Sequence, residues 1–332
     1  MKKHIMTGPK TSAWVDAPIP ALRDENDVIV KLKYCGICMS EHHRWTVGKE
    51  GDTLGHEPYG IVYAVGSNVK NLKVGDRVSG CFNGNAEYVS AHKWGLYPIP
   101  EGISDEDAIV EPLSCLMSAV SKVRIPMIGE KVAVVGCGYM GCGAISLLKL
   151  RGAYVVGVDI RKECLEDAKR CGADEVYTPD ELPAHYFDIP GKSLSFESEG
   201  NGFPLVMEWG ETNESLDLAL NMTRMRGQLA IGAYHTGEKR LVDMQQMNVK
   251  AIDCLSTHPR EADMNAIGCQ RAIKMLNDGR WDFKNLPVKV YPYTQIDQAH
   301  EELTSKYGKY MKALLDFDKT EGEPYILNGE QK

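Results

Sequence analysis

The chain has 332 residues, of which 43% are hydrophobic and 25% charged, and its formal net charge is −8. This length predicts about two domains, and the composition is typical of a soluble globular protein. The scattered Lys and Arg residues argue against nucleic acid as a partner, and no apolar run approaches the roughly 18 residues of a membrane span. The N-terminus carries no apolar signal segment, so a cytoplasmic location is expected.

The first third of the chain is rich in β-type patterns. Residues 28–34 alternate partly between apolar and polar side chains, as a half-buried strand does. Residues 59–69, 76–78 and 86–89 are further β-rich stretches, interrupted by glycines that favour turns. A compact antiparallel β unit is predicted here, followed by a helix over 112–123 with its proline in the first turn.

Strands and helices alternate in the middle of the chain. Strands are expected at 131–135, 154–159, 204–209, 228–232 and 251–255, and helices at 141–151, 163–171 and 214–223. This alternation predicts βαβ units and a parallel, doubly wound sheet. The fold class is therefore α/β, with a Rossmann sheet beside a mainly β unit.

The pattern changes again after residue 258. A helix is expected at 266–277, an exposed strand at 288–293, a helix at 296–303, a strand at 313–317 and then a loose extension. This tail is expected to rejoin the first β unit. The predicted domains are a discontinuous catalytic domain, 1–112 and 257–332, and a nucleotide-binding domain, 113–256.

A glycine-rich turn follows the strand that ends at Val135. In Gly136-Cys137-Gly138-Tyr139-Met140-Gly141 the glycines have the G-x-G-x-x-G spacing between a strand and a helix. Gly136 permits the tight turn, Gly138 lets the backbone approach a pyrophosphate, and Gly141 allows close packing of the helix. The helix N-terminus then offers free N–H groups to the phosphates. The turn therefore predicts a dinucleotide site.

An acid closes the next strand at Asp159. It is at the right distance to accept hydrogen bonds from the adenosine ribose diol, whereas a 2′-phosphate would meet like charge. NAD is therefore expected in preference to NADP. Arg161 keeps NADP open, because a nearby arginine can neutralise a 2′-phosphate.

Cys38, His56 and an acid form a second candidate site, a metal site. A thiolate, an imidazole and a carboxylate can hold zinc while leaving a position for water or substrate. Such a zinc polarises an alcohol oxygen and lowers the pKa of its proton. Cys35 and Cys38 also form a Cys-x-x-Cys, as in a redox pair or half of a zinc knuckle. No second Cys-x-x-Cys exists in the sequence, which argues against the zinc knuckle.

Around these residues the sequence resembles the zinc-containing medium-chain dehydrogenase/reductase family. The resemblance extends in the family's order over nearly the whole chain, through Gly36-Ile37-Cys38-Met39-Ser40-Glu41-His42-His43, Gly55-His56-Glu57, Gly75-Asp76-Arg77-Val78 and Lys312-Ala313-Leu314-Leu315-Asp316-Phe317. Glu111-Pro112-Leu113-Ser114 resembles a segment of the polyol (sorbitol-type) and threonine dehydrogenases. The resemblance implies a groES-like catalytic domain, a Rossmann domain and an active site in the cleft between them.

The resemblance also implies the ligands of one catalytic zinc. Cys38 and His56 match ligand positions, whereas Cys35 matches none and is expected to be a packing residue. The carboxylate is either Glu57 or Glu111. Glu41 matches an acid that supports the zinc-bound histidine.

Proton transfer and cofactor contacts are implied in the same way. Ser40 would pass the alcohol proton outward to His43. Glu57, beside the zinc, is a third candidate catalytic residue. Lys312 matches a basic residue that reaches the cofactor pyrophosphate. Many members carry a four-cysteine lobe with a second zinc, but only Cys81 lies in the corresponding region, so no structural zinc is expected.

The resemblance predicts reversible oxidation of a secondary alcohol to a ketone by hydride transfer to NAD, on a polyol, sugar or cyclitol. Trp45, His258 and Arg260 are candidate pocket residues from their positions. A homodimer or homotetramer is expected. The alternatives are a zinc-free, NADPH-dependent quinone or enone reductase and a non-enzymatic NAD-sensing protein.

Overall fold

The structure is a computed structural model, and it describes residues 1–124, 127–188, 201–260, 262–304 and 309–328. The chain divides into two compact units, Met1–Ser114 with Glu261–Lys332 and Cys115–Arg260. We call them the first and the second unit. No helix in the described ranges is long and apolar enough to cross a membrane.

The first unit is mainly β. Its large sheet has the strand order β16-β14-β15-β3-β4-β5-β7, with β6 paired to β3, while β1 and β2 form a separate antiparallel pair. The strands are β1 Lys2–Gly8, β2 Thr11–Asp16, β3 Asp27–Ile37, β4 Glu57–Val65, β5 Arg77–Gly80, β6 Tyr88–His92, β7 Leu96–Pro98, β14 Val288–Pro292, β15 Lys312–Asp316 and β16 Tyr325–Leu327. The helices are η1 Met39–Glu41, α1 His42–Val47, η2 Lys93–Gly95, α7 Ala262–Asn277, η5 Tyr293–Gln295 and α8 Ile296–Leu303.

The core of the first unit explains two departures from the sequence prediction. The strand expected to be exposed near residue 288 is mostly buried, because β14 lies between β15 and β16. The stretch expected to be a loose extension contains β16, which pairs antiparallel with β14. Cys35 is fully buried among apolar side chains, which confirms its packing role.

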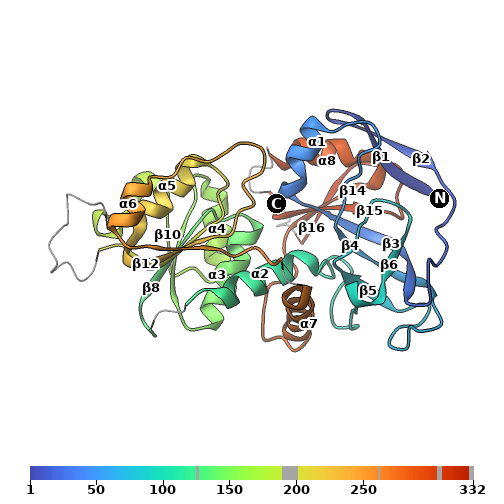
Figure 1. Cartoon of the computed structure of the whole chain (residues 1–332), viewed down its shortest axis with the longest axis horizontal. Helices are drawn as coiled ribbons and strands as arrows, with labels where there is room; N and C mark the ends of the chain where they lie inside the picture. The colour runs from blue at the N-terminus through green and yellow to red at the C-terminus, as the bar shows by residue number, and fades with distance from the viewer. Residues whose placement is uncertain (125–126, 189–200, 261, 305–308, 329–332) are drawn as a thin grey trace. The chain divides into compact units, whose positions relative to one another are not determined.

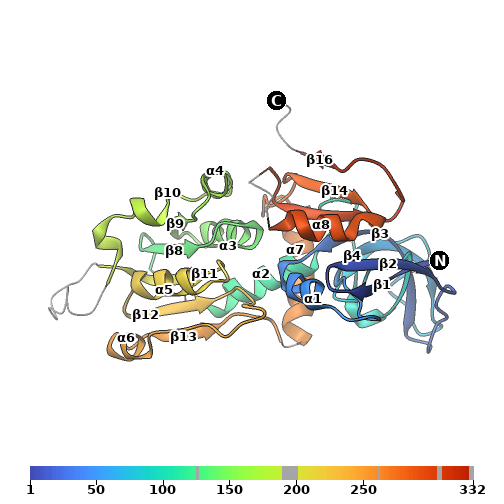
Figure 2. The ribbon, with the colours of Figure 1, turned by 90° about the horizontal axis from the view of Figure 1, so that it is seen from above.

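The second unit contains a six-stranded parallel sheet with the order β10-β9-β8-β11-β12-β13, which can be followed strand by strand in Figure 2. Helices pack on both faces of this sheet (Figure 1). The strands are β8 Lys131–Val135, β9 Tyr154–Val158, β10 Glu175–Tyr177, β11 Phe203–Glu208, β12 Thr223–Ile231 and β13 Asp253–Ser256. The helices are α3 Tyr139–Leu150, α4 Lys162–Arg170, η3 Pro179–Glu181, η4 Ala184–Tyr186, α5 Asn213–Met222 and α6 Met244–Val249, and α2 Glu111–Lys122 contains the boundary between the units.

The strand order of the second unit locates a ligand site. From β8 the chain proceeds outward to β9 and β10, and it then returns to β11 on the other side of β8. In such doubly wound sheets, ligands bind beyond the carboxyl ends of the strands, where the order reverses. That point lies between β8 and β11. This α/β architecture confirms the predicted fold class.

Candidate metal centre and nucleotide site

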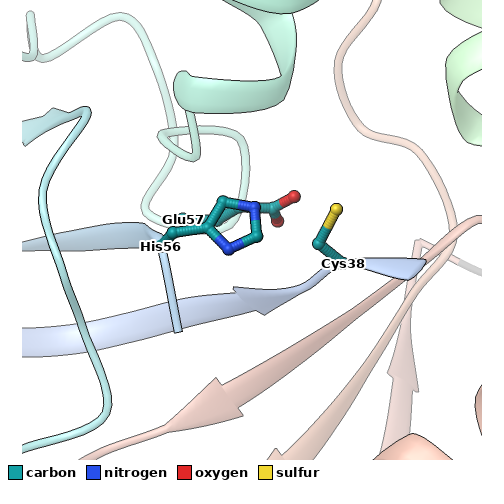
Figure 3. A group of neighbouring side chains, drawn as sticks. All are labelled: Cys38, His56 and Glu57. Carbon is teal, nitrogen blue, oxygen red and sulfur yellow. The ribbon is translucent and has the colours of Figure 1, made fainter. Parts of the chain in front are cut away.

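Three side chains with metal-binding atoms converge in the first unit. One ligand atom each from Cys38, His56 and Glu57 lies within 4.8 Å of the others, and the three side chains surround a common space in Figure 3. Within the described ranges this is the one such group of three or more His, Cys, Asp or Glu residues. The donor set of a thiol, an imidazole and a carboxylate fits a catalytic zinc, which uses three protein ligands and an open position.

The strand register brings these ligands together. Gly36 in β3 lies opposite Glu57 in β4, so the residues that follow β3 meet the residues that begin β4. A Cβ atom at position 36 would lie 2.0 Å from Glu57 Oε2. Glycine therefore leaves the space that the Glu57 carboxylate occupies.

A buried acid holds the imidazole of His56. Glu41 Oε1 lies 3.0 Å from His56 Nδ1 and accepts a 2.7 Å hydrogen bond from the backbone of Gly55. Burial lowers the pKa of His56, but hydrogen bonds to Cys38 and Glu41 outweigh burial and raise the pKa to about 12. The cluster thus favours positive charge at this point, and the Glu41 contact leaves Nε2 of the ring as the metal-binding nitrogen.

Lys312 pairs with the carboxylate of the cluster. Its Nζ lies 2.6 Å from Glu57 Oε2 and donates a 2.8 Å hydrogen bond to Oε1. Both side chains are buried, at 9% and 0% exposure, and a buried carboxylate needs such a partner. Burial lowers the pKa of Lys312, but Glu57 and Cys38 outweigh it and raise the pKa. Contact of Lys312 with a pyrophosphate stays a prediction.

The two residues of the expected proton relay differ in exposure. Ser40 Oγ donates a 3.2 Å hydrogen bond to Cys38 Sγ, which places this hydroxyl beside a predicted ligand. His43 is exposed on α1. The relay itself stays a prediction.

Glu111 and Trp45 lie outside the group formed by Cys38, His56 and Glu57. Glu111 begins α2, and its carboxylate is not part of the three-residue group. Trp45 is only 1% exposed, and its indole donates a 2.8 Å hydrogen bond to Asp297 and stacks on His300. The expectation that Trp45 lines a pocket is therefore wrong, because the core encloses its ring.

The glycine turn of the second unit has the geometry of a dinucleotide site. Gly136 has a φ of +92°, and a Cβ at Gly141 would lie 1.9 Å from the Gly136 carbonyl oxygen. Helix α3 begins next to Gly138, which has no side chain to cap the free N–H groups. This cradle fits a pyrophosphate.

Asp159 lies at the end of β9 beside this turn. Its carboxylate accepts hydrogen bonds from the backbone N–H groups of Cys137 and Arg161, each 2.8 Å long. The guanidinium of Arg161 lies 3.2 Å from the same carboxylate, so Arg161 partly neutralises Asp159. Ribose binding by Asp159 stays a prediction.

The remaining pocket candidates lie beyond the carboxyl ends of β12 and β13. Arg260 donates a 3.0 Å hydrogen bond to the hydroxyl of Tyr234, whose ring centroid is 5.3 Å from that of His258. Arg260 is exposed and His258 is partly buried. Their contact with a substrate stays a prediction.

Sequence reasoning missed the roles of Gly36 and of the Lys312 pair. The glycine two residues before Cys38 was a possible signal, but only strand register shows that it opposes Glu57. The Lys312–Glu57 pair joins residues 255 positions apart, and no local pattern indicates it.

Comparisons with known proteins agree with this fold. Residues 24–118 match the alcohol dehydrogenase GroES-like domain and residues 140–266 match the zinc-binding dehydrogenase family. The chain belongs to the zinc-binding alcohol dehydrogenases of the medium-chain type.

Individual relatives cover almost the whole chain. A probable D-xylulose reductase A from Arthroderma otae is 27% identical over 94% of this chain and 96% of its own. The solved structure of L-idonate 5-dehydrogenase from Escherichia coli K-12 is similar at a TM-score of 0.79 and 22% identity, over 95% of this chain and 98% of its own. A short chain alcohol dehydrogenase from Escherichia coli CFT073, complexed with NADH, gives a TM-score of 0.79 at 22% identity, over 96% and 99%.

Proposed function

We propose that the protein is a zinc-dependent, NAD-linked dehydrogenase that reversibly oxidises a secondary alcohol of a polyol, sugar or cyclitol to a ketone. The convergence of Cys38, His56 and Glu57 within 4.8 Å carries this proposal. Three protein ligands leave a fourth position at which an alcohol oxygen can bind. The relatives named D-xylulose reductase and L-idonate 5-dehydrogenase support a polyol or sugar substrate, and the neighbour complexed with NADH supports NAD as the cofactor.

The chain's own residues prepare the site for this chemistry. Zinc, when bound, acts as a Lewis acid that lowers the pKa of the alcohol, and NAD accepts the hydride. Glu41 fixes the ring of His56. Ser40, beside Cys38, receives the alcohol proton, and exposed His43 passes it to solvent.

Among the carboxylates, Glu57 is the proposed direct ligand and Glu111 the alternative. The basis is that Glu57 belongs to the group of converging ligand atoms, whereas Glu111 does not. The proposal further includes a small-molecule alcohol or ketone as substrate, a homodimer or homotetramer, and a cytoplasmic location.

The decisive experiment combines metal analysis with an activity screen. Purified protein is assayed for NAD reduction with polyols, cyclitols, aldoses and threonine, and the same sample is analysed for zinc. Cys38→Ala is expected to lose both zinc and activity. Cys35→Ala is the matched control, because Cys35 is buried in the apolar core, and it is expected to keep both.

Each alternative is tested by one additional assay on the same protein, of quinone and enone reduction with NADPH or of NAD binding. Full activity of metal-free protein on quinones or enones with NADPH would establish the zinc-free reductase. Tight NAD binding without turnover of any alcohol would establish an NAD-sensing protein.

A further inference from the structure

A buried acid at the carboxyl end of β11 organises its own turn. Glu208 is fully buried, and its Oε1 accepts hydrogen bonds from the backbone N–H groups of Gly210 (2.7 Å) and Glu211 (2.9 Å) and from the hydroxyl of Ser215 (2.7 Å). Its Oε2 lies 2.8 Å from His235 Nε2. Glu208 therefore joins the turn after β11 to the loop after β12.

The second partner of the imidazole indicates its tautomer. Arg240 Nε donates a 3.2 Å hydrogen bond to His235 Nδ1. A guanidinium is only a donor, so Nδ1 must be unprotonated and Nε2 carries the proton that it donates to Glu208. His235 thus bridges Arg240 and Glu208.

Further bonds tie the same two segments together. Arg240 also donates to the carbonyl oxygen of Glu211, and the backbone and hydroxyl of Thr236 both donate to the Glu211 carboxylate at 3.0 Å. Glu211 and His235 have positive φ angles, +63° and +52°, a conformation that residues with side chains rarely adopt. Such strain persists only where surrounding contacts impose it, and it is concentrated at ligand sites.

The network lies next to the dinucleotide turn. A Cβ at Gly136 would lie 2.7 Å from the backbone N of Gly210, so the turn after β11 touches the first glycine of the fingerprint. Asp159 marks the β9 side of the switch point as the place of the adenosine. The nicotinamide half of a bound NAD must then extend toward β11 and β12.

We propose that Glu208, His235 and Arg240 hold these two segments as a fixed wall against the nicotinamide half of the cofactor. In this arrangement His235 is a positioning residue, because it affects the cofactor through the two segments that it holds together. The inference rests on the proposed function, since it presumes NAD as the cofactor. A preformed wall lowers the entropy that the cofactor loses on binding and improves the alignment of the nicotinamide for hydride transfer.

The test compares NADH with ADP-ribose, which lacks the nicotinamide, by calorimetric titration of the full-length zinc enzyme. His235→Ala is expected to raise the Kd for NADH about tenfold and to change that for ADP-ribose less than about twofold. It is also expected to lower kcat, by about tenfold or more. His235→Gln, whose amide can replace the Nε2–H donor, is expected to restore much of both. Lys239→Ala, an exposed position in the same loop, is the matched control and is expected to change neither.

The outcomes separate this inference from the function on which it rests. Unchanged NADH binding and kcat in His235→Ala would overturn the wall alone. Equal weakening of NADH and ADP-ribose would also overturn it, because that pattern indicates general loosening of the unit. Failure of the wild-type protein to bind NADH would overturn the proposed function and this inference together.

Discussion

The space at Gly36 allows a direct test of Glu57 as a zinc ligand. In Gly36→Ala the new Cβ would lie 2.0 Å from Glu57 Oε2, whereas ordinary contact begins near 3.4 Å. The carboxylate must therefore move by about 1.4 Å, far beyond the tolerance of about 0.2 Å for metal–ligand distances. Zinc affinity is expected to fall by about 100-fold or more, since even changes in the residues that orient ligands cost about 10- to 100-fold.

Competition with a chromogenic chelator measures the zinc affinity, and kcat is determined on the same samples. Gly8→Ala is the matched control, because it lies in a strand of the same unit and its Cβ would meet only a side-chain oxygen of Thr11, at 3.3 Å. Wild-type zinc affinity and kcat in Gly36→Ala would refute the assignment of Glu57 as the ligand.

Three further predictions follow from the geometry. Glu57→Gln is expected to lower zinc affinity about tenfold or more, and Glu111→Gln is expected to lower it much less. Equal losses of zinc affinity in the chelator competition assay would contradict this difference. Burial, with positive charge on His42 and His4, lowers the pKa of His300 from 6.5 to about 3. The unfolded chain therefore binds more protons between these values, and stability falls as pH drops below 6.5, by at most about 1.4 kcal/mol per pH unit. His300→Leu is expected to reduce that slope in urea unfolding at matched zinc content, and an unchanged slope would reject the assignment. Asp159→Ser is expected to reduce the preference for NAD over NADP about tenfold or more, because the substitution removes a charge that repels a 2′-phosphate. The ratio of kcat/KM for NAD to kcat/KM for NADP measures this preference. An unchanged ratio would exclude this role of Asp159.

The parallel sheet was largely predictable because its signals are local. The strand at 131–135 in the second unit and the helix at 296–303 in the first unit have the bounds that the sequence predicts. The other expected strands and helices of the second unit differ at their ends by a few residues, with β12 beginning earlier at Thr223. Apolar periodicity and glycine turns determine such elements within a few residues of sequence.

Pairing between distant strands was less accessible. A lone short stretch such as β16 has no strong periodic signal, and its strand exists because β14 offers a free edge. The burial of β14 depends in turn on β15 and β16 as neighbours. Exposure at these positions is thus a property of the assembled sheet, which the local pattern does not contain.

The metal centre also combines residues that a local motif identifies with residues that only the fold brings together. Cys38 and His56-Glu57 form recognisable motifs, but the atoms that control them come from elsewhere: Lys312 joins Glu57 from 255 positions away. Trp45 was misjudged for a related reason, since its partner Asp297 lies 252 positions along the chain. The indole N–H of Trp45 donates to the partly buried carboxylate of Asp297 while the ring lies in the apolar core, and this satisfied contact stabilises the buried ring. The identity of a ligand can therefore come from a motif, whereas its charge balance and access depend on distant strands and helices.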